Sequence, residues 1–259
     1  MLSNVMREGR CLIPYLTFAD PTPAGSEALM RAALEAGADV LEIGLPFSDP
    51  IADGPVIQAS HQRALVHNPT LDQVFELVNR LKRDFKQPII LMGSVNLIFR
   101  YGIEAFFEQC QRVAVDGVIL PDLSFEEYGP FIEPSGEAGV PIISLVSTLC
   151  RPDRLNLIIS ESKGFVYVMS TTGITGERSI INDQLSDFIK TIKDIKPIPV
   201  AVGFGISQPS QVGDVWEYAE GAIVGSYFVR LIASQPDLDA AVLVFKSEIK
   251  RFYETAAAS

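Results

Sequence analysis

The stretch LEIGLPFSDPIADGP, residues 41–55, decides how the rest of the chain is interpreted. It starts within the largely apolar run 38–44, which ends at glycine and proline and in which Glu42 is the acid nearest the end of the run. A short apolar run with such boundaries predicts a buried strand. A carboxyl group at the end of a buried strand loses its hydration, which raises its pKa and lets it exchange protons near neutral pH.

A second acid, Asp53, follows eleven positions after Glu42 among small and turn-forming residues. One carboxyl group on a rigid strand and another on the loop that follows it suit a proton-transfer pair. The alternative is an exposed glutamate at the strand end, with Asp53 serving as a turn residue or as the N-cap of a helix. The pattern of residues alone leaves both interpretations open.

Composition excludes several classes of protein. The chain has 259 residues, enough for an ample core, and no apolar run is as long as a membrane span or a signal-peptide core. A net charge of −11 argues against binding to nucleic acid or anionic membranes, which require a basic face. The three cysteines lack metal-ligand spacing, which indicates a reducing compartment, and with only two histidines no metal site is expected.

Strand and helix signals alternate along the chain. The predicted strands are 12–17, the region of Leu41, 88–92, 117–120, 141–146, 164–169, 198–202 and 221–224. The predicted helices are 26–35 with Ser26 as N-cap, 70–81 with Thr70 as N-cap, 102–113, 125–138, 152–160, 183–194, 209–218, and helices from 226 to the end. We expect the helix at 125–138 to be broken, because it contains two glycines and two prolines.

Eight apolar strands that are each followed by a helix predict an α/β fold with a parallel sheet covered on both faces. Eight repeats in this length favour a single (β/α)8 TIM barrel, with residues 1–259 as one domain. A doubly wound open sheet is the alternative. It would have fewer units and a glycine-rich turn after the first strand, which residues 17–20 do not supply.

Three connections after predicted strands have unusual sequences. The connection from Leu45 to about Asn68 is far longer than usual, which indicates function. The segment 171–179 is rich in glycine and hydroxyl groups, typical of a loop that closes over a ligand but also of a solvated surface loop. The segments 203–207 and 225–226 contain glycines that let the backbone approach an anion, ahead of helices with free N–H groups. Barrels commonly hold a phosphate there, so these segments predict a phosphate site.

Lysine positions exclude one mechanism. All eight lysines are predicted on helices or before strands, whereas a Schiff-base aldolase needs a lysine that points into the pocket. Proton transfer by carboxyl groups on a phosphorylated substrate remains. The aromatic residues that would form pocket walls, or equally the barrel core, are Tyr15, Phe18, Phe47, Tyr167 and Phe204.

Residues 41–58 resemble, almost letter for letter, the signature of the tryptophan synthase α subunit family. Further motifs of that family follow in the expected order, so the resemblance covers nearly the whole chain; they lie at 96–99, 121–123, 173–176, 203–207 and 225–226. The resemblance implies a lyase that cleaves indole-3-glycerol phosphate to indole and glyceraldehyde 3-phosphate. It also implies that Glu42 is the acid/base residue and Asp53 the second catalytic carboxylate.

The same resemblance implies the remaining site. The residues that would bind the substrate and its phosphate are Tyr167, Thr175, Gly176, Phe204, Gly205, Gly225 and Ser226. Asp49 and Pro50 match a loop that contacts a β subunit, which carries pyridoxal phosphate and receives the indole in an α2β2 assembly. This chain itself would need no cofactor and no metal, and it would be cytoplasmic.

The chain departs from the family pattern at Ala19, where glycine is usual, at Gly93-Ser94, where a tyrosine is common, and at Ser124, where proline is common. It also leaves little room before the first strand for the family's N-terminal helix. Two alternatives therefore stay open. One is a mainly regulatory partner that activates a β subunit and turns over weakly. The other is a different phosphosugar barrel such as a phosphoribosyl isomerase, although the expected carboxylate after the fifth strand is missing.

Overall fold

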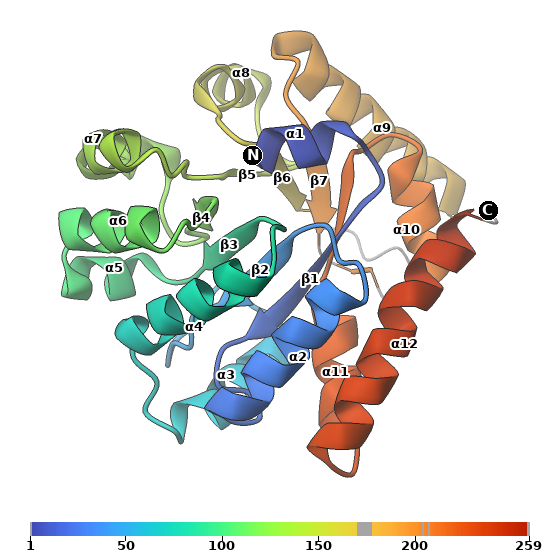
Figure 1. Ribbon diagram of the computed structural model, residues 1–259. Coiled ribbons are helices and arrows are strands. Elements are labelled where there is room, and N and C mark those ends of the chain that lie inside the picture. The colour runs from blue at the N-terminus through green and yellow to red at the C-terminus, as the bar shows by residue number, and fades with distance from the viewer. Residues whose placement is uncertain (1, 170–177, 204, 207, 258–259) are drawn as a thin grey trace.

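The computed structural model shows parallel strands in the middle of the molecule and helices around them (Figure 1). It describes residues 2–169, 178–203, 205–206 and 208–257, without the side chains of residues 178–183 and 257. The strands are β1 Cys11–Thr17, β2 Leu41–Gly44, β3 Ile89–Met92, β4 Gly117–Ile119, β5 Ser144–Ser147, β6 Val166–Met169, β7 Val200–Gly203 and β8 Gly221–Val224.

The sheet closes into a barrel. Its eight strands lie in the order β4-β3-β2-β1-β8-β7-β6-β5, and every paired neighbour is parallel. The two end strands meet at a parallel bridge between Val118 and Ile142. The Val118 N–H donates to the Pro141 carbonyl at 2.9 Å, and the Ile143 N–H donates to the Val118 carbonyl at 2.8 Å. The predicted (β/α)8 barrel is therefore confirmed, and the open-sheet alternative is wrong.

Helices follow the strands as the alternation predicted. They are α1 Leu2–Arg7, α2 Pro23–Glu35, α3 Pro55–Leu65, α4 Leu71–Asp84, α5 Val95–Tyr101, α6 Ile103–Arg112, α7 Gly129–Ala138, α8 Pro152–Glu161, α9 Arg178–Ile195, α10 Pro209–Trp216, α11 Ser226–Ala233 and α12 Leu238–Ala257, with a 3-10 turn at Phe125–Glu127.

Two predicted N-caps have different outcomes. Thr70 caps α4 as predicted, in a reciprocal pair of hydrogen bonds with Gln73. Ser26 does not cap α2. The helix begins earlier because the Thr22 hydroxyl accepts the Gly25 N–H at 3.0 Å and Pro23 occupies the first turn. Ser26 instead lies inside the helix and accepts the Ala19 N–H at 2.9 Å.

Three helices were not predicted as such. The long connection after β2 contains α3, so its non-helical parts are 45–54 and the short segment after Leu65, and α5 precedes α6. At the N-terminus the six residues of α1 suffice to cover the amino-terminal end of the barrel, where Leu2 and Met6 are buried in the interior cluster. The expected break near 125–138 lies at Tyr128, between the 3-10 turn and α7, and α7 then continues through Pro134.

The alternation of side chains along β2 places the acid inside the barrel. Leu41 and Ile43 pack in the core between strands and helices, whereas Val40 packs in the cluster inside the barrel. Successive side chains of a strand point to opposite faces, so Glu42 faces the interior with Val40. Because β2 ends at Gly44, this acid lies near the carboxyl end of the strand, where barrels hold their active sites.

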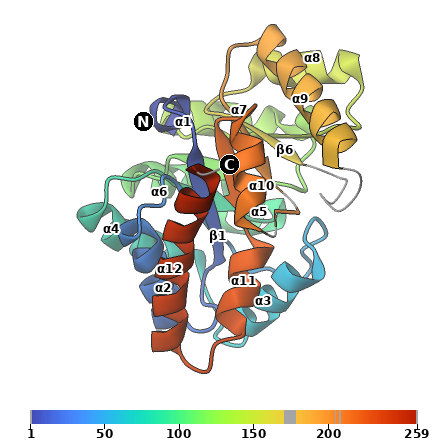
Figure 2. The ribbon, with the colours of Figure 1, turned by 90° about the vertical axis from the view of Figure 1, so that its right-hand side faces the viewer.

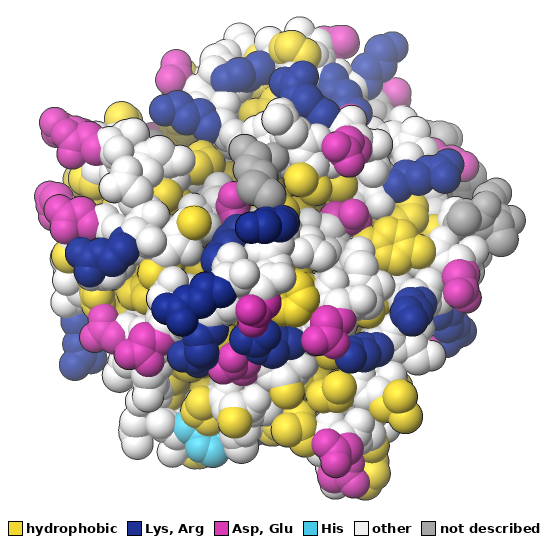
Figure 3. All heavy atoms as spheres, viewed as in Figure 1, with side chains coloured by type: hydrophobic (Ala, Val, Ile, Leu, Met, Phe, Trp, Pro, Cys, Tyr) yellow, Lys and Arg dark blue, Asp and Glu magenta, His cyan; other side chains and the backbone are white. Residues whose placement is uncertain are grey.

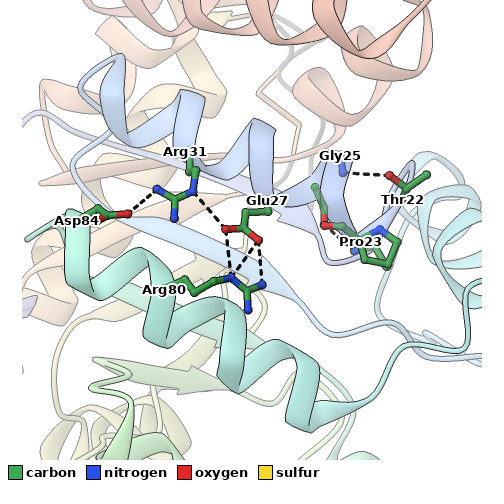
Figure 4. A network of polar contacts seen from close by, with 9 residues as sticks. Thr22, Pro23, Gly25, Glu27, Arg31, Arg80 and Asp84 are labelled. Carbon is green, nitrogen blue, oxygen red and sulfur yellow. Dashed lines mark hydrogen bonds and ion pairs between the residues drawn. The ribbon is translucent and has the colours of Figure 1, made fainter.

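The outer surface is charged and mixed. The face in Figure 3 carries basic and acidic side chains interspersed, with no large area of one sign. On the outside, Glu27 of α2 accepts hydrogen bonds from Arg31 and from Arg80 of α4, and Arg31 also donates to Asp84 at 2.6 Å (Figure 4). None of the described helices combines the length and the apolar character needed to cross a membrane.

Candidate active site

Glu42 is completely buried, and among the described residues neither of its carboxylate oxygens has a hydrogen-bond partner. Its register neighbours are Tyr15 on β1 and Ile90 on β3. Burial, and secondly the nearby charge of Asp53, raises the pKa of Glu42 to about 8. The interpretation of this residue as an exposed strand-end glutamate is therefore wrong. A carboxyl group in this state is protonated at neutral pH and can donate its proton.

A cavity of about 290 Å³ adjoins the Glu42 carboxyl group at the barrel mouth. It is bordered by the loop before α3, by the strand ends of β1, β3, β6 and β8, and by the start of α11. The polar residues and glycines that line it are Tyr15, Glu42, Asp53, Gly54, Tyr167, Gly205, Gly225, Ser226 and Arg230. The two helices on this border, α3 and α11, lie side by side (Figure 2).

Two tyrosine rings fill the barrel next to this acid, and each depends on a glycine of the neighbouring strand. A Cβ on Gly44 would overlap the Tyr15 hydroxyl group, and a Cβ on Gly203 would overlap that of Tyr167. Burial raises the pKa of both tyrosines well above the usual range, and the carboxylates of Asp53 and Glu42 add to this. Both hydroxyl groups therefore stay protonated.

Asp53 lies in the loop after β2 and is not a helix cap, because Gly54 is the N-cap of α3. Its side chain is 14% exposed and turns toward His61, with 3.1 Å between Oδ2 and Nε2. The backbone of Asp53 is also fixed, since its N–H donates to the Pro50 carbonyl at 3.1 Å and the Gln58 amide donates to its carbonyl at 2.7 Å. The second predicted carboxyl group thus borders the same cavity as Glu42.

The cavity border also includes backbone groups suited to an anion. Gly205 has a φ of +86°, a left-handed conformation that favours glycine. Helix α11 starts at Ser226, and its first intrahelical bond runs from the Val229 N–H to the Gly225 carbonyl at 3.0 Å. The N–H groups of the first turn before Val229 thus have no partner within the helix, and the positive end of the helix dipole lies there. Arg230 follows one turn after Ser226 on the same side and also lines the cavity.

Most of the predicted site residues meet in this one cavity. Glu42, Asp53 and Tyr167 line it together with Gly205, Gly225 and Ser226. Thr175, Gly176 and Phe204 lie outside the described residues. Asp49 and Pro50 border a neighbouring cavity of about 30 Å³, which Phe47 and Asp53 also line. Of the candidate aromatic walls, Phe18 packs in the core between strands and helices instead.

Two residues of this region were not predicted as part of the site. Arg230 lines the cavity, and its spacing of four from Ser226 on a helix is a signal that predicts a shared face. His61 contacts Asp53, but no local pattern indicates this, because the contact depends on how the loop folds back onto α3. All eight lysines are on helices or before strands, as predicted. No cluster of potential metal ligands occurs among the described residues.

The three departures from the family pattern each have a structural setting. Ala19 has a φ of +64°, a left-handed conformation in which glycine is less strained than alanine. Ser94 donates to Asp122 at 2.6 Å and caps α5, while Asp122 accepts the Val95 N–H at 2.8 Å. Ser124 donates to Glu127 at 2.7 Å. None of these side chains lines the cavity beside Glu42.

The fold and this site define a class: a (β/α)8 barrel whose mouth holds a buried carboxyl group that no described residue pairs with, an arrangement suited to acid/base chemistry. The model of the family "Tryptophan synthase alpha chain" matches residues 2–257. The chain belongs to this family.

Individual relatives agree with this assignment. The tryptophan synthase alpha chain of Petrotoga mobilis is 36% identical over 251 residues, which span 97% of this chain and 96% of the relative. That of Synechocystis sp. is 40% identical over 233 residues, 89% and 88% of the two chains. The structure of tryptophan synthase subunit alpha from Campylobacter jejuni has a TM-score of 0.86 at 32% identity, covering 95% and 98% of the two chains.

A second structure comes from Pyrococcus furiosus and concerns mutual activation of the tryptophan synthase α2β2 complex. Its TM-score is 0.87 at 34% identity. It covers 95% of this chain and 98% of the matched one. The predicted family is confirmed, and the alternative of a phosphoribosyl isomerase is wrong.

Proposed function

We propose that this chain, as one catalytic domain, performs the α reaction of tryptophan synthase, with Glu42 and Asp53 as its catalytic groups. In that reaction indole-3-glycerol phosphate is cleaved to indole and glyceraldehyde 3-phosphate. Membership of the family supports the reaction. The observation that carries the residue assignment is the completely buried Glu42 carboxyl group, which has no hydrogen-bond partner in the described part of the chain and lies beside a cavity that also borders Asp53.

Glu42 would serve both ends of the proton transfer. Its carboxyl group donates a proton to C3 of the indole ring, and the resulting carboxylate accepts the proton of the glycerol hydroxyl group. The carbon–carbon bond then breaks, its electron pair returns to the ring, and the hydroxyl carbon becomes the aldehyde. Glu42 ends protonated, so the cycle needs no net proton and no second reactant. A pKa near 8 suits both roles, because neither protonation state is costly near neutral pH.

Asp53 would stabilise the charge that this step creates. Protonation at C3 leaves a cationic, indolenine-like ring whose N–H becomes a strong hydrogen-bond donor. A carboxylate beside that N–H stabilises the cation and makes indole a better leaving group. Its place on the border of the same cavity as Glu42 supports this role.

The phosphate would lie at the start of α11. The free N–H groups after Gly225, the Ser226 hydroxyl group and the backbone at Gly205 support an anion there, and Arg230 supplies a positive charge. The family resemblance adds Thr175, Gly176 and Phe204 to this end of the site. Tyr167 would lie along the substrate between the phosphate and Glu42.

The chain would deliver indole to a β subunit, as expected for a member of an α2β2 assembly. Asp49 and Pro50 are the proposed contacts, since they lie in the exposed part of the loop that ends at Asp53. Pyridoxal phosphate would belong to the β subunit, and this chain would use no cofactor. Its described cysteines are unpaired, which supports a cytoplasmic location.

The direct test is a steady-state assay of the purified chain with indole-3-glycerol phosphate, with and without a β subunit. We expect release of indole that becomes faster when the β subunit is present. Activation of the β subunit without any cleavage would instead support a regulatory partner, and the proposed reaction would then be wrong.

A further inference from the structure

A buried imidazole, that of His61, attaches both ends of the loop that carries Asp53 to α3. This ring has an exposed fraction of only 5%. Its Nδ1 accepts the Phe47 backbone N–H at 3.2 Å, and its Nε2 lies 3.1 Å from Asp53 Oδ2. Phe47 and Asp53 stand near the two ends of the 45–54 loop, so one ring contacts the loop at both ends.

These contacts fix the tautomer of the ring. A nitrogen that accepts a backbone N–H carries no proton, so Nδ1 of His61 is unprotonated. The proton of the neutral ring is therefore on Nε2, from which it points to the Asp53 carboxylate. An imidazolium would place two donors, Nδ1–H and Phe47 N–H, against each other. The Tyr15 hydroxyl group, 3.4 Å from Nε2, lies at the edge of the same contact.

The imidazole itself is held by a rigid support. The preceding residue, Ser60, shares a hydrogen bond of 2.6 Å with Thr17 of β1. Two residues after His61, Arg63 donates to both oxygens of the buried Asp20 at 2.7 Å each. Helix α3 is thus attached to the end of β1 on both sides of His61. Because the helix is fixed to the barrel, a side chain on it can hold a loop residue at a defined position relative to the barrel.

We propose that His61 is a positioning residue, which holds the Asp53 carboxylate in its catalytic orientation by donating Nε2–H while Nδ1 anchors the Phe47 end of the loop. This inference rests on the proposed role of Asp53. Among the described residues, His61 is the sole side-chain hydrogen-bond donor to that carboxylate. Without it, the carboxylate rotates freely about its side-chain bonds, and misplacement of a catalytic group is costly to turnover.

Two substitutions separate the two contacts. His61→Asn keeps an acceptor near the place of Nδ1 and removes the Nε2 donor. His61→Gln places an amide N–H near Nε2 and removes the acceptor for Phe47. In His61→Asn we expect kcat for indole-3-glycerol phosphate cleavage to fall roughly 10- to 100-fold, while KM changes by no more than about twofold. In His61→Gln, which keeps a donor near Nε2, we expect kcat to be close to that of the wild-type chain. His67→Gln is the matched control, because the other histidine is exposed and contacts only the Pro21 carbonyl among the described residues.

Coupling to Asp53 distinguishes positioning from a general structural role. In an Asp53→Asn background, His61→Asn should cause little further loss of kcat, since both substitutions remove the same interaction. Equal losses in His61→Asn and His61→Gln, or full additivity with Asp53→Asn, would show that the ring acts only as a structural contact and would overturn the proposal.

A spectroscopic readout tests the inference even if the chain does not cleave this substrate. The ¹⁵N NMR shifts of the His61 ring should show a protonated Nε2 and an unprotonated Nδ1 at neutral pH, and the Nε2 resonance should move in Asp53→Asn. A protonated Nδ1, or a ring insensitive to Asp53→Asn, contradicts the proposal. Absence of cleavage in the wild-type chain with its β subunit would contradict the proposed function instead.

Discussion

Two glutamates of this chain show opposite behaviour because their surroundings differ. Glu27, on the outer face of α2, accepts hydrogen bonds from Arg80 at 2.8 Å and from Arg31 at 3.2 Å (Figure 4). These hydrogen bonds lower the pKa of Glu27, and the bond from Arg80 has the largest effect. Glu42, in the barrel, has no partner among the described residues, and burial raises its pKa to about 8. The same side chain is thus fixed as a carboxylate in one place and poised to exchange a proton in the other.

The difference shows that the barrel mouth lacks the ion pairing that stabilises a carboxylate on the surface. Neighbouring strands surround Glu42 with apolar and aromatic side chains, and no described cation lowers its pKa, so its charged form is unfavourable. Paired charges such as those at Glu27 occur on the exterior, where water screens them. Burial without a partner destabilises the ionised form of an acid, and acids in this state concentrate at functional sites.

The largest expected effect is that of Glu42→Gln. This substitution keeps the size of the side chain and removes its ability to transfer a proton, so we expect kcat to fall by about 10³- to 10⁴-fold. Binding of a substrate-like phosphate ligand should stay nearly intact when measured by calorimetry. Glu27→Gln is the matched control and should retain wild-type kcat. Unchanged turnover in Glu42→Gln would rule out the assigned role.

Asp53→Asn should have the next largest effect. The amide keeps the shape of the side chain but cannot balance a positive charge on the indole ring, so we expect kcat to fall about 10²-fold, less than for Glu42→Gln. Steady-state assays of the two variants under one set of conditions give the comparison. A larger loss in Asp53→Asn than in Glu42→Gln would reverse the proposed division of roles.

The pH dependence should separate the two glutamates in activity. Because the first step uses protonated Glu42, kcat/KM should fall about tenfold per pH unit above its pKa of about 8. Glu27 does not line the cavity and has a lowered pKa, so Glu27→Gln should leave this alkaline limb unchanged. A profile that stays flat to pH 10 would show that Glu42 does not start the reaction protonated.

Stability should change with pH in opposite directions at the two sites. The folded state keeps Glu42 protonated between its unfolded pKa of 4.5 and its folded pKa of about 8. As the pH rises through this range, the free energy of unfolding should therefore decrease, and this group contributes at most about 1.4 kcal/mol per pH unit. The contribution of Glu27 is present above pH 4.5 and is lost as the pH falls through its lowered folded pKa. Chemical denaturation at several pH values should show a smaller decrease in stability with rising pH in Glu42→Gln. In Glu27→Gln it should show a smaller loss of stability at acidic pH.

The smallest expected effect is the stability change in Glu27→Gln at neutral pH. Its partners are partly exposed, with 45% of the Arg80 side chain and 30% of the Arg31 side chain accessible. Exposed pairs contribute little, so we expect a loss of about 1 kcal/mol or less in the free energy of unfolding. A loss of several kcal/mol would mean that this network fixes α2 against α4 far more firmly than its exposure suggests.

Much of the fold follows from local sequence. The strand predicted around Leu41, the eighth strand at 221–224 and the helix capped by Thr70 depend on apolar runs and on contacts within a few residues, so they could be predicted. The short helices at 55–65 and 95–101 could not, because prolines, polar residues and loop motifs obscure their periodicity. The start of α2 was predicted at Ser26 rather than after Thr22, since two hydroxyl residues compete as N-caps and only the position of Pro23 decides between them.

The sequence by itself determined the number of strands and their parallel pairing and singled out Glu42 and Asp53 as candidates, because strand alternation and residue type are local properties. Only the tertiary structure decided that Glu42 is buried with no hydrogen-bond partner among the described residues, that Asp53 turns to His61, and that Arg230 joins the same cavity. These properties arise where segments distant in sequence meet at the mouth of the closed barrel. The desolvation and hydrogen bonding of a side chain there depend on its neighbours in space, which no local pattern of residues specifies.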